Sequence, residues 1–149
     1  MLYIIRGLPG SGKSTFARDS RFAGALVLEN DMYHVREGKY RFDQENQSDA
    51  IDWCLETCRA AIEAGMDVVV ANTFTRRNYI KRYVDIASYY GHDYKVYKTT
   101  GPWKNTHNVL QDVYDHMRDG WEPWEGEILV SAEPLIDSSV PWVFVEKQP

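Results

Sequence analysis

The stretch that decides the fold is Gly7-Leu-Pro-Gly-Ser-Gly-Lys-Ser14, which matches the pattern G-x-x-x-x-G-K-[ST] at each required position. Gly10 and Gly12 let backbone N–H groups turn inward and approach a phosphate closely. Lys13 supplies a mobile cation for the β- and γ-phosphates of a nucleoside triphosphate, and the Ser14 hydroxyl suits Mg²⁺. The pattern predicts a phosphate-binding loop formed by Gly7, Pro9, Gly10, Ser11, Gly12, Lys13, Ser14 and Thr15.

The segments around this loop alternate between strand-like and helix-like patterns. A short apolar strand over residues 2–6 precedes the loop, and a helix is expected from residue 14 to about residue 20. Further strands are expected at residues 25–29, 67–71 and 94–98, and further helices at residues 47–64, 75–90 and about 108–118. Such alternation is typical of βαβ units, so it predicts a three-layer α/β domain with a parallel sheet.

Length and composition indicate one domain over residues 1–149, with a core at about 2–125 and an irregular tail at 126–149. The net charge of −5 argues against a protein that coats long duplexes, but it leaves room for a small basic cleft that holds one end of a nucleic acid. No apolar run approaches the length of a membrane span, and the first residues are too short for a signal peptide. Cys54 and Cys58 lie on the apolar face of a predicted helix, so we expect core thiols in a reducing cytoplasm.

A carboxylate follows the second predicted strand at the position where a phosphotransferase needs one. The carboxyl ends of parallel strands face the ligand crevice, so Asp31 is expected to share a cleft with the loop. There it would accept the proton of an attacking hydroxyl. Capping a helix is the alternative role for Asp31, and Glu29 is the rival carboxylate.

The third predicted strand ends in Ala71 and is followed by Asn72 and Thr73. These two polar side chains could hold Mg²⁺ through water, orient Asp31, or simply cap the next helix. Ala71 stands where many enzymes with this loop carry a carboxylate for the metal, so Ser14 and the phosphates would carry more of that task. The GTPase signatures D-x-x-G and N-K-x-D are absent from the chain.

The densest group of cations is formed by Arg76, Arg77, Lys81 and Arg82. It reads either as a local nucleic-acid contact or as an ordinary solvated helix surface. Arg118 is a candidate cation for the charge that develops during phosphoryl transfer, with a plain surface arginine as the alternative.

Several stretches together resemble one family. They are Gly7-Leu-Pro-Gly-Ser-Gly-Lys-Ser-Thr15, Asp31-Met-Tyr33, Gly38-Lys-Tyr-Arg-Phe-Asp43 and Asn72-Thr-Phe-Thr75. They are similar to the 5′-hydroxyl kinase domain of bacteriophage polynucleotide kinase and its small phage and bacterial relatives. The resemblance covers roughly residues 2–125. It implies a three-layer P-loop NTPase fold with a parallel sheet of four or five strands and a short helical lid.

The resemblance also implies transfer of the γ-phosphate of ATP, with Mg²⁺, to a 5′-hydroxyl of DNA or RNA. Lys13 and Ser14 then match the family's phosphate and metal residues, and Asp31 matches its general base. The family often has Asp-Asp-Tyr-Arg where this chain has Asp31-Met-Tyr-His34, so the arginine that clamps a substrate phosphate is missing or replaced by Arg36. The candidate substrate residues are Tyr33, His34, Arg36, Asn72, Thr73, Arg76, Lys104 and His107.

Two other functions stay open at this point. The reduced set of arginines and the net charge of −5 favour a kinase for a nucleoside or another small hydroxylated molecule. Ala71 and the short lid, in which Lys104, His107 and Arg118 would cover the phosphates, favour an ATP-binding regulatory module without turnover. The expected compartment is the cytoplasm of a bacterial or phage-infected cell, and the sequence specifies no oligomeric state.

Overall fold

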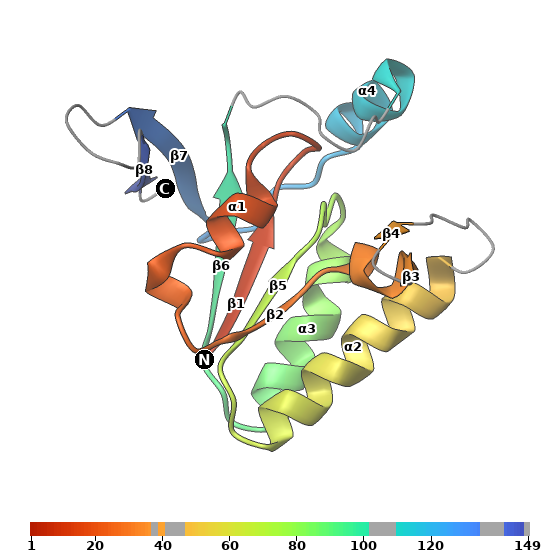
Figure 1. The fold of residues 1–149 in the computed structure, drawn as a ribbon, viewed down its shortest axis with the longest axis vertical. Coiled ribbons are helices and arrows are strands. Elements are labelled where there is room, and N and C mark those ends of the chain that lie inside the picture. Colours follow the sequence, from red (N-terminus) through yellow and green to blue (C-terminus); the bar gives the residue numbers. More distant parts are fainter. Residues whose placement is uncertain (37–38, 41–46, 102–109, 135–141, 148–149) are drawn as a thin grey trace.

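The computed structural model describes residues 1–36, 39–40, 47–101, 110–134 and 142–147. Its centre is a six-stranded sheet in the order β2-β5-β1-β6-β7-β8 (Figure 1). The strands are β1 (Leu2–Arg6), β2 (Leu26–Leu28), β5 (Val68–Ala71), β6 (Tyr94–Thr99), β7 (Ile128–Pro134) and β8 (Trp142–Lys147). All neighbouring strands pair in parallel except β7 and β8, which are antiparallel. The predicted α/β class is confirmed.

Helices and short 3-10 turns connect these strands. They are α1 (Lys13–Ala17), η1 (Ser20–Phe22), η2 (Asn30–His34), α2 (Gln47–Glu63), α3 (Arg77–Tyr89) and α4 (Gln111–Asp119). A small antiparallel pair, β3 (Val35–Arg36) and β4 (Lys39–Tyr40), follows η2. Helix α1 ends earlier than predicted because Asp19 accepts a hydrogen bond from the Arg21 N–H and starts η1. Within the described ranges, no helix is both long and apolar enough to cross a membrane.

Alternate residues of the strands point to opposite faces of the sheet and belong to two separate hydrophobic cores. On one face Leu2, Ile4, Val68 and Val70 pack against α2 and α3, and the buried thiols of Cys54 and Cys58 belong to this cluster, as predicted. On the other face Ile5, Val69 and Ala71 pack with Phe16 of α1 and Phe22 of η1. The sheet is therefore covered on both faces, which confirms the three-layer architecture (Figure 1).

The structure corrects the expectation of an irregular tail over residues 126–149. In its described part, β7 extends the parallel sheet beside β6 and β8 adds an antiparallel edge, so the sheet has six strands where four or five were expected. Phe144 of β8 is buried against Phe16, with ring centroids 4.9 Å apart. Contacts with α1 and β6 stabilise these strands. The spacing of apolar residues within residues 126–149 does not reveal such contacts, so it could not predict the strands.

Candidate functional site

The strand order places the phosphate-binding loop at a switch point of the sheet. Strand β1 lies between β5 and β6, and the chain first builds the β5 side of the sheet and then crosses to the β6 side. Open α/β sheets bind ligands outside the carboxyl ends of the strands at such a point. The loop that starts at Gly7, directly after β1, lies there.

Two left-handed glycines shape this loop. Gly10 has a φ of 79° and Gly12, the N-cap of α1, a φ of 97°, a region that favours glycine. The Ser11 N–H donates to the Leu8 carbonyl at 3.1 Å. The Lys13 ammonium folds back and donates to the same carbonyl at 3.0 Å. The lysine is thus held over the loop.

The far side of the loop is anchored on the end of β6. The hydroxyls of Ser11 and Thr99 are 2.7 Å apart, and the Gly101 N–H donates to the Ser11 carbonyl at 3.2 Å. A Cβ at Gly7 would overlap both hydroxyls, so only glycine fits there. Thr99 and Gly101 were not predicted as site residues. The sequence indicated only that they follow a predicted strand, at the carboxyl end where ligands bind.

The negative charges of two carboxylates act on the Lys13 ammonium. Burial lowers the pKa of Lys13 to about 8, and the charges of Glu29 and then Asp31 oppose that shift. The Glu29 side chain is 16% exposed and lies 3.6 Å from Arg18 Nη1. Within the described part of the chain, its buried Oε1 makes no hydrogen bond. Glu29 and Asp31, which follow β2, are therefore near enough to Lys13 for their charges to act on it.

Asn72 ties the end of β5 to the segment that carries Asp31. Its Oδ1 accepts the Asn30 N–H at 2.8 Å, and its Nδ2 donates to Asn30 Oδ1 at 3.3 Å. The next residue, Thr73, accepts the Gly7 N–H with its carbonyl at 3.4 Å. The interpretation of Asn72 and Thr73 as a helix cap is wrong, because α3 begins at Arg77 with Arg76 as its N-cap.

Arg6 is a further residue that sequence analysis missed. It is the last residue of β1 and fully buried, and its Nη1 binds Glu127 Oε2 at 2.9 Å. Its guanidinium also donates to the carbonyls of Phe74, at 2.6 Å, and Glu122, at 2.7 Å, and lies 4.0 Å from the Trp121 ring centroid. Arg6 thus joins the start of the loop to segments 72–75 and 121–127. A charged residue at the end of an apolar strand was the available signal.

The remaining predicted residues have different surroundings. Arg118 is exposed and pairs with Asp115, at 3.2 Å, and Asp119, at 3.3 Å, on its own helix. Tyr33 is half-buried, with its ring 6.2 Å from that of Trp53. Lys104 and His107 lie outside the described residues, and so do the side chains of His34 and Arg36. The role of Arg118 stays a prediction.

The loop fits a nucleoside triphosphate. Its left-handed glycines and the half-buried Lys13 form an anion site, and Ser14 offers a hydroxyl beside it. The described residues contain no group of three or more histidine, cysteine or acidic side chains that could hold a metal ion by themselves. A Mg²⁺ ion here would use Ser14 and the phosphates, as this ion commonly does.

Fold and loop together define a P-loop protein with a kinase-like fold. The model of the AAA_33 family, described as an AAA domain, matches residues 2–112, and the chain belongs to this family. An uncharacterized protein of Pasteurella multocida, PM0531, is 32% identical over 152 residues, which cover 87% of this chain and 82% of that protein. NEDD4-binding protein 2 of Homo sapiens is 28% identical over 155 residues, but the match spans 95% of this chain and only 8% of the human protein.

Solved structures share the fold at low sequence identity. A sugar kinase from Janibacter sp. HTCC2649 superposes with a TM-score of 0.62 at 17% identity, covering 87% of this chain and 84% of that one. Kti12 of Chaetomium thermophilum, in complex with ADP-AlF3, gives 0.60 at 13% identity, covering 88% and 89%. A chain of the Pnkp1/Rnl/Hen1 complex gives 0.56 at 18% identity, covering 74% and 43%.

Proposed function

We propose that this protein transfers the γ-phosphate of ATP to a hydroxyl group, and that its acceptor is the 5′-hydroxyl end of DNA or RNA. The observation that carries the proposal is the carboxylate pair beside the loop lysine. Glu29 and Asp31 both act on the charge of Lys13, so an acidic group is close to the place where the terminal phosphate would bind.

Each residue has a role in this reaction. Lys13 neutralises the β- and γ-phosphates, and Ser14 is available to Mg²⁺, which when bound would offset phosphate charge. Asp31 accepts the proton of the attacking hydroxyl. Asn72 holds the Asn30 backbone next to Asp31 and thereby positions it. Arg118 is the proposed lid cation, which requires it to leave Asp115 and Asp119.

Motif similarity supports a nucleic-acid acceptor. The combination of the loop, Asp31 and Asn72-Thr73 resembles polynucleotide kinases, and the Pnkp1/Rnl/Hen1 complex contains a chain of the same fold. A small hydroxylated acceptor is the second candidate, favoured by the net charge of −5 and by the fold shared with a sugar kinase. Ala71, which leaves the end of β5 without a carboxylate, favours the third, a nucleotide-binding module without turnover.

The test uses γ-labelled ATP with 5′-hydroxyl DNA and RNA oligonucleotides, nucleosides and sugars. Label on oligonucleotides is expected; label on nucleosides or sugars alone would exclude the polynucleotide acceptor. Asp31→Asn should lower the transfer rate by about 10²-fold or more while ATP still binds. Asp93→Asn is the matched control. This aspartate is exposed and precedes β6, so it lies at the amino ends of the strands, whereas the loop lies at their carboxyl ends. Normal turnover by Asp31→Asn would contradict the assignment of the base.

A further inference from the structure

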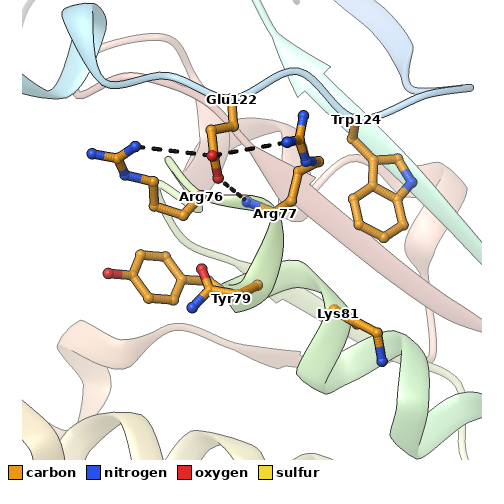
Figure 2. A pocket seen from close by; sticks show the side chains of 7 residues that line it. Arg76, Arg77, Tyr79, Lys81, Glu122 and Trp124 are labelled. Carbon is orange, nitrogen blue, oxygen red and sulfur yellow. Dashed lines mark hydrogen bonds and ion pairs between the residues drawn. The ribbon is translucent and has the colours of Figure 1, made fainter.

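An open pocket lies beside the first turn of α3 (Figure 2). Its wall combines cationic, aromatic and amide side chains from α3 and its N-cap with two residues of the segment that follows α4. The lining residues are Arg76, Arg77, Asn78, Tyr79, Lys81, Glu122 and Trp124.

The pocket is positively charged although the protein is acidic. Its lining residues include three cations and one carboxylate; Lys81 pairs with Asp85, 2.8 Å away on the same helix, so the excess positive charge comes from Arg76 and Arg77 beside Glu122. Glu122 uses Oε1 to accept the Arg77 backbone N–H at 2.9 Å. Its Oε2 lies 3.9 Å from Arg76 Nη1 and 3.9 Å from Arg77 Nη2, which is too far for hydrogen bonds. The guanidiniums, with 47% and 58% of their side chains exposed, can therefore turn to an anion at little cost.

Two aromatic rings accompany these cations. Tyr79 is 43% exposed, although aromatic side chains of this size are commonly covered. Trp124 packs on the core cluster of α2 and α3 and also lines the pocket, so its ring is a fixed platform. Arginines next to open aromatic rings match the phosphates and bases of single-stranded nucleic acid, in which the bases are unstacked.

The pocket and the phosphate-binding loop are linked by short, hydrogen-bonded connections. Thr73 contacts Gly7 at the start of the loop. Arg76 is only three positions after Thr73, a span of at most roughly 10 Å. The Glu122 N–H donates to the Thr75 carbonyl at 2.8 Å, and buried Arg6 holds the Glu122 carbonyl at 2.7 Å. The pocket therefore keeps a fixed position at the ligand edge of the sheet.

We propose that this pocket binds the nucleotides that follow the 5′ end of a single-stranded DNA or RNA acceptor. The link to a 5′ end rests on the proposed function, whereas strand binding does not. Arg76 and Arg77 contact phosphates, and Tyr79 and Trp124 stack on bases. A polymer can occupy the loop and the pocket at once, so the pocket favours polymers over nucleosides.

Fluorescence anisotropy with labelled single-stranded DNA and RNA decamers, titrated at several salt concentrations, tests the pocket. Arg76→Ala and Arg77→Ala should each flatten the slope of log affinity against log salt by about 0.7. Tyr79→Ala should weaken binding roughly five-fold or more, because a stacked base is lost. Arg82→Ala is the matched control, since it removes an exposed cation of the same helix that does not line the pocket. Thermal melting confirms that each variant is folded.

The outcomes separate this proposal from the proposed function. Unchanged binding by all three pocket variants overturns it. The proposal is also overturned if polyglutamate displaces the labelled strand as well as unlabelled DNA does, because the pocket would then be a site for acidic polypeptides. Strand binding that these variants lose supports the pocket even if no oligonucleotide is phosphorylated, a result that would reject only the proposed function. If oligonucleotides are phosphorylated, Arg77→Ala and Tyr79→Ala should lower kcat/KM for decamers but leave that for nucleosides unchanged.

Discussion

Raising the pH from 7 to 9 should weaken ATP binding about tenfold through one side chain. Burial lowers the pKa of Lys13 to about 8 in the ligand-free protein. The ammonium is then about nine-tenths charged at pH 7 and about one-tenth charged at pH 9. The triphosphate, whose last ionisation lies below pH 7, binds the charged form of Lys13, so affinity falls as pH rises through 8. At pH 8 each bound ATP should take up about half a proton.

Isothermal titration calorimetry between pH 7 and 9 measures this effect, and two buffers of different ionisation enthalpy give the proton uptake. Lys13→Arg is the control, because a guanidinium stays charged over the whole range. Its affinity should be lower at pH 7 but nearly independent of pH. A wild-type affinity that is flat between pH 7 and 9, or an equal slope in Lys13→Arg, would refute the assigned role of burial.

Three further changes test the supports of the site. Glu127→Ala should lower the free energy of unfolding by about 3–5 kcal/mol in urea titrations, because it leaves the buried charge of Arg6 without its carboxylate; Glu127→Gln, which keeps an acceptor, should cost clearly less. Gly7→Ala should cost about 1–3 kcal/mol in the same titration and weaken ATP binding, because its Cβ overlaps two hydroxyls; a variant with normal ATP affinity would contradict the packing. Asn72→Ala should lower the rate of phosphate transfer more than ATP affinity, because the Asn30 N–H loses its acceptor. Asn72→Asp should recover most of that rate in the labelled-ATP assay.

The sequence predicted the central part of the fold because that part repeats local patterns. The run Val68–Ala71 is apolar throughout and buried on both faces of the sheet, and Ile80, Tyr83 and Ala87 recur at helical spacing on α3. The loop could be recognised because its glycines have no conformational substitute at φ values of 79° and 97°.

The rest depended on contacts between segments far apart in the chain. Thr99 meets Ser11 across 88 positions and Arg6 meets Glu127 across 121. Neither pair has a local signature, because a threonine after a strand and a glutamate in a loop are ordinary residues. No role was predicted for Glu122 for the same reason, although it accepts the first N–H of α3.

The family match ends at residue 112, but the phosphate-binding loop depends on residues beyond it. Arg6, the residue before the loop, pairs with the Glu127 carboxylate and donates to the Glu122 carbonyl. Phe16 of α1, the helix that continues the loop, packs on Phe144 of β8. A buried guanidinium without its carboxylate is strongly destabilising, so the start of the loop could not keep its place if segment 121–127 were lost. The same segment carries Glu122 and Trp124 into the pocket of α3, so one stretch of chain supports both the nucleotide site and the proposed acceptor site.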